Sequence, residues 1–200
     1  MTERKTRKDA VRNREALLAA AAALYARSDS PDEVTMARVA DEAGVGKGTL
    51  FRAFGDRAGL LRALYEARLE PVARTLEAGS PESRRSPEAR IRELLDAVAC
   101  FKLDNRRLAA AIEAGGGSSS PYESDHYRRW HEHLCDLLAQ ALPREDVSFV
   151  AHTLLAATRA DLVEHLVGRQ GMSRDELRTR LATLIDRIIR PEDDPTRNGP

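Results

Sequence analysis

Apolar residues recur at intervals of three and four along most of this chain, which is the spacing of one face of an α-helix. Such stretches cover about 9–27, 56–76, 87–103, 122–142, 145–169 and 173–190. Runs rich in Val, Ile, Thr and aromatic residues, which would indicate strands, are absent from the sequence. The pattern predicts an all-α fold of about nine helices once shorter helical segments are included.

Capping and turn residues set the boundaries of the helices in the first third of the chain. Thr35 is suited to cap a short helix, and Gly44 is suited to end that helix with a positive φ. Gly46 lies where the next short helix would be capped, and Asp56 can cap the long helix after it. Pro71 falls inside that long helix and is predicted to kink or end it.

Similar signals divide the remaining two thirds. Ser86 and Pro87 read as an N-cap followed by proline at the first helical position, after a linker from 79. A short helix is predicted over 105–114, Pro143 ends the next helix, and Ser173 caps the last one. Polar or glycine-rich composition predicts disorder at 1–8 and from 191, and a flexible loop at 115–121.

Charge is balanced overall but uneven along the chain. Residues 1–68 carry 13 Lys and Arg against 10 Asp and Glu, whereas 69–200 carry 19 against 22. A basic end on a neutral chain fits a localised DNA footprint, although so small an asymmetry also arises by chance. No apolar run reaches the length of a signal or membrane segment, so a cytoplasmic protein without membrane partners is expected. Cys100 and Cys135 are expected to be buried, reduced thiols.

The stretch from Thr35 to Leu61 carries the strongest functional signal. It predicts a short helix, a turn at Gly44 and a second short helix with Lys47, Thr49 and Arg52 around its first turns. The small and apolar residues that two crossing helices would bury are Val39, Ala40, Ala43, Val45, Leu50 and Phe54. This pattern is typical of a helix-turn-helix, whose second helix enters the major groove of DNA.

The same stretch resembles the DNA-binding head of the TetR family of bacterial regulators, over roughly 9–68. The residues that carry the resemblance are Thr35, Val39-Ala40, Ala43-Gly44-Val45, Lys47-Gly48-Thr49-Leu50-Phe51, Phe54, Arg57 and Leu60. The resemblance implies a DNA-binding domain over 1–55 and a ligand-binding and dimerisation domain over 56–200. It also implies a homodimer formed by the two last predicted helices, 145–169 and 173–190, and a ligand-responsive repressor that binds a palindromic operator.

Site residues follow from this resemblance position by position. Thr35 and Arg57 would reach phosphates, Lys47 a guanine edge or a phosphate, and Thr49 a thymine methyl, while Gly48 would let the backbone approach the duplex. The full predicted set is Thr35, Gly46, Lys47, Gly48, Thr49, Phe51, Arg52 and Arg57. Three residues depart from the family pattern, because Phe51 replaces Tyr, Ala53 replaces His and Gly46 replaces a capping Ser.

A pocket for a mostly apolar effector is predicted in the body, among the helices between about 56 and 169. The candidate ligand residues are Leu95, Val98, Phe101, Trp130, Leu134, Thr153 and Thr158, with the 115–121 loop as a gate. Core packing is the default interpretation of the stripe that contains Trp130 and Leu134, and the lining of a ligand cavity is the alternative. The effector itself is unknown from the sequence.

Enzyme, metal and cofactor signatures are not found in the sequence. His131 and His133 are two residues apart and point to different faces of a helix, so surface histidines are favoured over a metal site. Asp161 and His165 are spaced as a helix pair without a nucleophile to serve. Activators, and helical ligand-binding or interaction proteins whose head no longer binds DNA, stay open as alternatives to a repressor.

Overall fold

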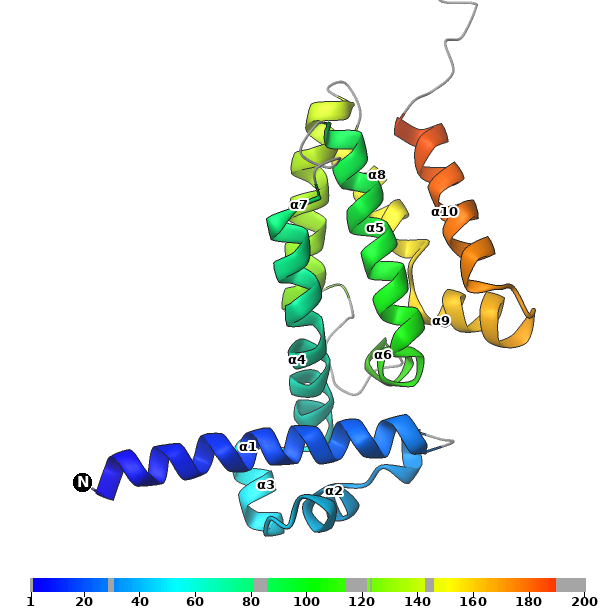
Figure 1. The fold of residues 1–200 in the computed structure, drawn as a ribbon. Coiled ribbons are helices and arrows are strands. Elements are labelled where there is room, and N and C mark those ends of the chain that lie inside the picture. The colour runs from blue at the N-terminus through cyan, green and yellow to red at the C-terminus, as the bar shows by residue number, and fades with distance from the viewer. Residues whose placement is uncertain are drawn as a thin grey trace, which may run out of the picture. The chain divides into compact units, whose positions relative to one another are not determined.

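The computed structural model describes residues 2–28, 31–80, 86–113, 122, 124–142 and 146–189. These residues form helices and no strand, which confirms the predicted all-α class (Figure 1). The elements are α1 (Thr2–Arg27), η1 (Pro31–Glu33), α2 (Met36–Ala43), α3 (Lys47–Phe54), α4 (Arg57–Ala78), α5 (Pro87–Asp104), α6 (Arg106–Glu113), α7 (Asp125–Ala141), α8 (Val147–Ala156), α9 (Ala160–Val163), the π-helical segment η3 (Glu164–Arg169) and α10 (Arg174–Ile189). None of the helices in these ranges is long and apolar enough to cross a membrane.

The chain divides into two compact units. Met1–Glu70 and Arg107–Ser119 form the first, called here the head unit, and Pro71–Arg106 and Ser120–Pro200 form the second, the body unit. The head unit therefore includes α1 to α3, most of α4, and all but the first residue of α6. The body unit includes α5 and α7 to α10. The functional boundary between 55 and 56 stays a prediction.

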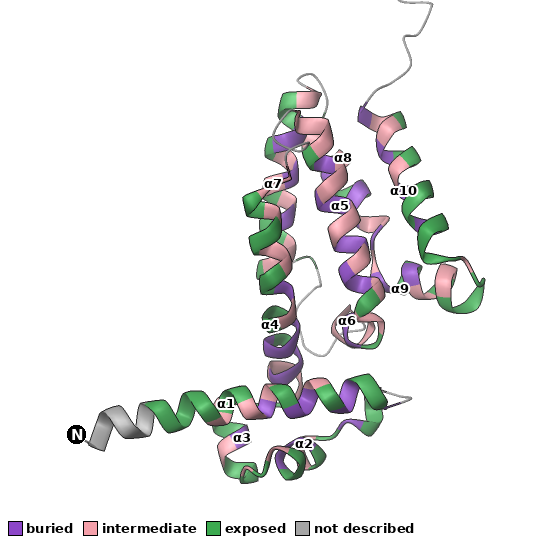
Figure 2. Ribbon diagram, in the orientation of Figure 1, coloured by how far each residue is buried: buried purple, intermediate pink, exposed green. Residues whose placement is uncertain are grey.

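The core of the head unit lies where α1 and α4 meet the two short helices. Burial follows the sequence pattern, since one apolar stripe of each helix is covered and the opposite faces are exposed (Figure 2). The fully or nearly fully buried side chains include Leu17, Leu24, Tyr25, Val39, Leu50, Leu60, Leu61, Leu64 and Tyr65. Helices α2 and α3, too short to be stable alone, are held by this packing.

Helix α4 begins as predicted and continues past Pro71, where a kink or an end was predicted, to a point close to the predicted 76. The Asp56 carboxylate accepts a hydrogen bond from the Gly59 N–H at 2.8 Å, which caps the first turn. The helix continues through Pro71 to Ala78, so an end at Pro71 is wrong. Proline removes one backbone donor there, whereas the remaining turns keep their bonds, and the Thr75 hydroxyl donates to the Pro71 carbonyl at 3.0 Å.

The body unit is built around α5, which packs against both α7 and α10, while α8 packs on α7. The buried core residues contributed by these helices include Ile91, Leu94, Leu95, Val98, Leu134, Leu137, Leu138, Leu154, Leu155, Leu181 and Ile185. Ser86 caps α5 by accepting the Ala89 N–H at 3.1 Å, and Pro87 occupies its first turn, as predicted. Ser173 likewise caps α10 through the Glu176 N–H at 3.1 Å.

Two predicted boundaries are wrong. The single helix predicted over 145–169 is divided into α8, α9 and η3, because Arg159 adopts an extended backbone and the buried Thr158 hydroxyl donates to the Leu155 carbonyl at 2.8 Å. The first helix begins at Thr2 rather than near 9, since nothing in the polar start of the chain breaks a helix once it has formed. The predicted loop at 115–121 and tail from 191 lie outside the described residues.

Candidate DNA interface and ligand site

The turn between α2 and α3 is fixed by backbone hydrogen bonds. Thr35 has an extended backbone and its hydroxyl accepts the Arg38 N–H at 3.3 Å, which caps α2. Gly44 has a φ of 63°, its N–H donates to the Asp41 carbonyl at 3.2 Å, and the next N–H, of Val45, donates to the Ala40 carbonyl at 3.0 Å. This is a Schellman ending, which requires a residue that tolerates the left-handed region. The predicted roles of Thr35 and Gly44 in local structure are confirmed.

The first turns of α3 present an open face. Gly46 caps the helix without a side-chain hydrogen bond, and Lys47 and Gly48 behind it are both exposed. No atom lies within 4 Å of the place where a Cβ on Gly48 would stand. Packing within the head therefore does not require a small residue at position 48, and any requirement for glycine there must come from a partner.

The rest of α3 divides into an inward and an outward side. Leu50 is fully buried in the head core, and Thr49 is half-buried. Phe51 is 50% exposed, which is high for so large an apolar side chain. Arg52 is also exposed, and its Nε donates back to the Gly48 carbonyl at 3.2 Å. Of the predicted DNA residues of α3, Lys47, Gly48, Phe51 and Arg52 are therefore exposed, and Thr49 is half-buried.

Arg57 has partners within the head unit. Its Nε lies 3.4 Å from the Val34 carbonyl oxygen, and one terminal nitrogen lies 3.3 Å from the Tyr25 hydroxyl and 3.7 Å from an Asp32 carboxylate oxygen. Burial raises the pKa of Tyr25, and the Arg57 charge opposes that shift. Arg57 therefore braces α4 against the end of α1 and the start of α2, and its predicted phosphate contact stays a prediction.

Two further head residues were not predicted from the sequence. The Arg14 guanidinium donates to the Ala53 carbonyl at 3.0 Å and lies 4.5 Å from the centre of the Phe54 ring, so it fixes the end of α3 from α1. A Cβ on Gly59 would stand 2.0 Å from the Phe54 carbonyl oxygen, which only glycine avoids. Neither contact leaves a periodic or capping signal in the sequence, because both depend on how separate helices pack.

The predicted ligand residues are divided by the structure. Five of them, Leu95, Val98, Phe101, Trp130 and Leu134, are buried on α5 and α7, which pack together. Thr158 is buried with its hydroxyl bonded to Leu155. Thr153 is exposed, and its hydroxyl donates to the Phe149 carbonyl at 2.9 Å. Thr153 is therefore not placed to orient a ligand within the α5–α7 core.

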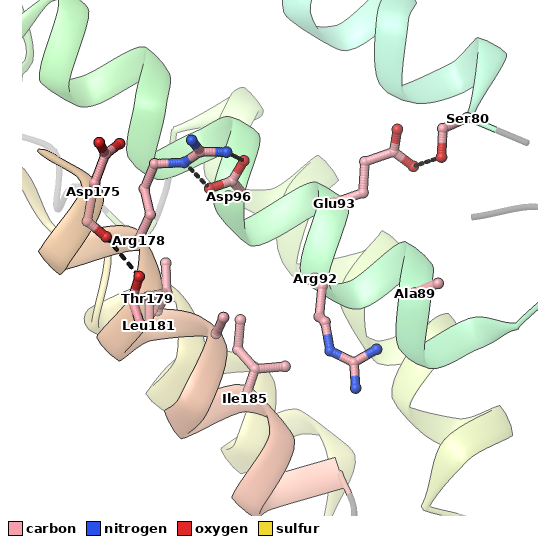
Figure 3. A pocket seen from close by; sticks show the side chains of 11 residues that line it. Ser80, Ala89, Arg92, Glu93, Asp96, Asp175, Arg178, Thr179, Leu181 and Ile185 are labelled. Carbon is pink, nitrogen blue, oxygen red and sulfur yellow. Dashed lines mark hydrogen bonds and ion pairs between the residues drawn. The ribbon is translucent and has the colours of Figure 1, made fainter. Parts of the chain in front are cut away.

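A groove of about 740 Å³ lies elsewhere in the body unit, between α5 and α10 (Figure 3). Its lining residues are Ser80, Ala89, Arg92, Glu93, Asp96, Asp175, Arg178, Thr179, Leu181, Ala182 and Ile185, and no predicted ligand residue is among them. Arg178 binds both oxygens of Asp96, at 2.6 and 2.8 Å, and Arg92 donates to Asp186. These guanidinium groups already have carboxylate partners on the facing helix, so they join α10 to α5.

Comparison with known proteins gives a consistent result. Residues 17–64 match the model of the bacterial regulatory proteins of the tetR family. An HTH-type transcriptional regulator of Staphylococcus aureus is 30% identical over 131 residues, which are 66% of this chain and 70% of the relative. A TetR-like transcriptional regulator of Rhodococcus sp. RHA1 has the same fold, with a TM-score of 0.60 and 19% identity over 90% of this chain and 97% of its own.

A second solved structure, a protein of unknown function from Rhodococcus sp. RHA1, has a TM-score of 0.66 and 24% identity. The alignment covers 88% of this chain and 94% of that one, so the shared fold extends well beyond the head. The match to the family model over 17–64 and the Staphylococcus relative, together with the capped turn and the outward face of α3, identify the function of the helix-turn-helix. The chain belongs to the TetR family of bacterial transcriptional regulators and is a DNA-binding regulator.

Proposed function

We propose that this protein is a ligand-responsive repressor that binds a palindromic operator as a homodimer in the cytoplasm. In this proposal residues 1–55 bind the DNA, and residues 56–200 hold the effector and form the dimer. The observation that carries the proposal is the outward face of α3, where Lys47, Gly48 and Arg52 are exposed at the start of a helix whose other side is locked into the head core.

The head would dock with the first turns of α3 in the major groove. Lys47 would donate to a guanine edge or a phosphate, and Thr49 would meet a thymine methyl. Thr35, exposed at the N-terminus of α2, would contact a phosphate and fix the register, as would Arg57 in exchange for its present partners. Two heads related by a two-fold axis would read half-sites about one helical turn apart, or slightly more.

Dimerisation is proposed through the two last helices predicted from the sequence, 145–169 and 173–190, and within them chiefly through α8 and α10. Both helices expose large apolar side chains that the body unit does not cover. Phe149 of α8 is 70% exposed and Leu184 of α10 is 41% exposed, and Ile188 lies one turn beyond Leu184 and is half-buried. Apolar surface of this kind favours burial against a partner.

The effector is proposed to be mostly apolar and to bind among the α5 and α7 side chains. Those side chains are packed as a core, so binding requires them to move apart. The effector then controls the operator only if it binds the non-operator conformation more tightly, because equal affinity for both conformations shifts no population.

A mobility-shift titration against the DNA upstream of its own coding sequence tests the proposal. We expect a discrete complex that survives excess unrelated DNA and weakens steeply with salt, since each phosphate contact releases counterions. Lys47→Ala is the matched variant, because Lys47 is exposed and has no role in the head core. Equal, weak binding to every DNA by both proteins would reject the proposal and favour a helical binding protein without an operator.

A further inference from the structure

A stack of rings lies where α8 packs on α7. His131 of α7 and His152 of α8 face each other with ring centroids 4.0 Å apart and planes inclined by 26°. The ring of Tyr127 is stacked on His152 at 5.9 Å and on His131 at 6.3 Å. Tyr127, His131 and His152 are called here the imidazole stack. The proposed DNA and effector sites use none of the three residues.

The hydrogen bond from Tyr127 suits His152 to a neutral imidazole. The Tyr127 hydroxyl lies 2.7 Å from Nδ1 of His152, and with the hydroxyl as donor this nitrogen is the acceptor of a neutral ring. Nε2 of His131 lies 3.3 Å from the Ser148 carbonyl oxygen, which can only accept, so this nitrogen carries the proton. A proton added to Nδ1 of His152 would force the bond to Tyr127 to reverse.

Charged groups of both signs lie near the stack. The Cys135 thiol lies 3.7 Å from Nε2 of His131, and its pKa is raised by burial and by the carboxylates of Asp136, Asp146 and Glu132. On the other side, the Arg159 guanidinium lies 6.0 Å from the centre of the Tyr122 ring, which meets Tyr127 edge-on. That arginine is paired with Asp161, whose carboxylate oxygens accept from it at 3.0 and 2.9 Å, so it adds little net charge beside the stack.

Protonation therefore works against the contact between the helices. Partial loss of hydration, followed by the neighbouring His131, lowers the pKa of His152 below its ordinary value. A histidine that prefers to be neutral in the packed state binds a proton more readily when the packing opens. The packed state is then favoured above the ordinary histidine pKa of about 6.5 and loses stability as the pH falls below it.

We propose that the imidazole stack makes the packing of α8 on α7 acid-sensitive, so that a neutral His152 ring stacked on His131 holds the helices together and protonation of His152 releases α8. A consequence rests on the proposed function. Phe149 lies one turn before His152 on α8, in the surface proposed to form the dimer. Release of α8 would disturb that surface, and both the dimer and its operator affinity would weaken in mild acid.

Hydrogen exchange of the full chain, followed by mass spectrometry of peptides from α8, tests the proposal at about pH 7.5, 6.5 and 5.5, with labelling times scaled to the intrinsic rate at each pH. We expect the scaled exchange of α8 to rise by up to about tenfold across this range, which is the limit for one proton that binds only to the open state with a pKa of about 6.5. His152→Gln cannot be protonated and should flatten the response. His165→Gln is the matched control, because His165 lies in η3 and contacts Gln170 rather than the stack.

Scaled exchange of α8 that does not change with pH, or that rises equally in wild type and His152→Gln, would overturn the proposal. Should His152→Gln fold poorly, His131→Gln removes the other ring and must flatten the response in its place. Mobility shifts at the same pH values keep the two proposals apart. Acid-sensitive α8 exchange in a chain that never binds an operator rejects only the proposed function, whereas operator binding with pH-independent exchange rejects only the stack.

Discussion

Gly48 and Gly59 provide a matched pair of substitutions that separates a role in DNA binding from a role in folding. Both glycines lie in the first turn of a head helix, α3 and α4 respectively. A Cβ on Gly48 meets nothing within 4 Å, whereas a Cβ on Gly59 would stand 2.0 Å from the Phe54 carbonyl oxygen. The same change, glycine to alanine, should therefore have opposite consequences at the two positions.

For Gly48→Ala we expect a small gain in stability. Alanine is favoured over glycine within helices by up to about 1 kcal/mol, and the gain should be at the low end near a helix start. Gly59→Ala gains the same propensity but must displace a backbone carbonyl, which no side-chain rotation can relieve. Overpacking of this kind costs about 1–3 kcal/mol, so the net change in unfolding free energy should be a loss.

For operator affinity the order of the two effects is reversed, and Gly48→Ala should cause the direct loss. If α3 approaches the duplex as closely as proposed, a methyl group on Gly48 takes space that the DNA needs, and the loss of a good contact costs about 1–3 kcal/mol, or roughly 5- to 150-fold in affinity. Thermal unfolding and fluorescence anisotropy with labelled operator measure the two effects. A Gly48→Ala protein that binds its operator as tightly as wild type would refute the close approach of α3.

Three further predictions follow from other contacts. Leu184→Asp should convert the dimer to a folded monomer in light scattering, because an unpaired carboxylate in an apolar interface costs several kcal/mol; an intact dimer would place the interface elsewhere. Thr49→Ala should change the preferred base at one operator position, whereas Arg57→Ala should lower the affinity for all operators alike. Arg57→Ala should also lower the melting temperature of the head, because the bonds to Tyr25 and Val34 are lost. Burial, followed by the charges of Lys102 and Arg129, lowers the pKa of His126 to about 4. The free energy of unfolding should therefore fall by up to about 1.4 kcal/mol per pH unit as the pH falls from 6.5 toward 4. In denaturant titrations, His126→Phe should lessen this fall.

Local structure in this protein was predictable where a residue forms hydrogen bonds to backbone groups close to it in the sequence. Thr35, Gly44, Asp56 and Ser86 each set a helix boundary through bonds to neighbours three to five residues away, and each does so in the structure. Periodicity gave the buried faces for the same reason, since a helix places every third or fourth residue on one side.

Features that no capping residue or periodicity marks were not predictable. The break at Arg159 and the position of Gly59 beside the Phe54 carbonyl are of this kind, although the residues concerned are close in sequence. His131 and His152 are 21 positions apart, and only the packing of α8 on α7 brings their rings together. The same limit applies to the effector residues, because Thr153 lies on the expected helix and yet on its exposed side.

Selection of bound sequences from a random duplex library tests whether α3 of a two-fold symmetric dimer reads an operator. We expect enrichment of one pseudo-palindrome with half-sites about one helical turn apart, or slightly more, and loss of base preference within the half-sites for Lys47→Ala. A folded wild-type protein that enriches no two-fold symmetric sequence, or that enriches the same sequence as strongly after Lys47→Ala and Thr49→Ala are combined, would contradict this expectation.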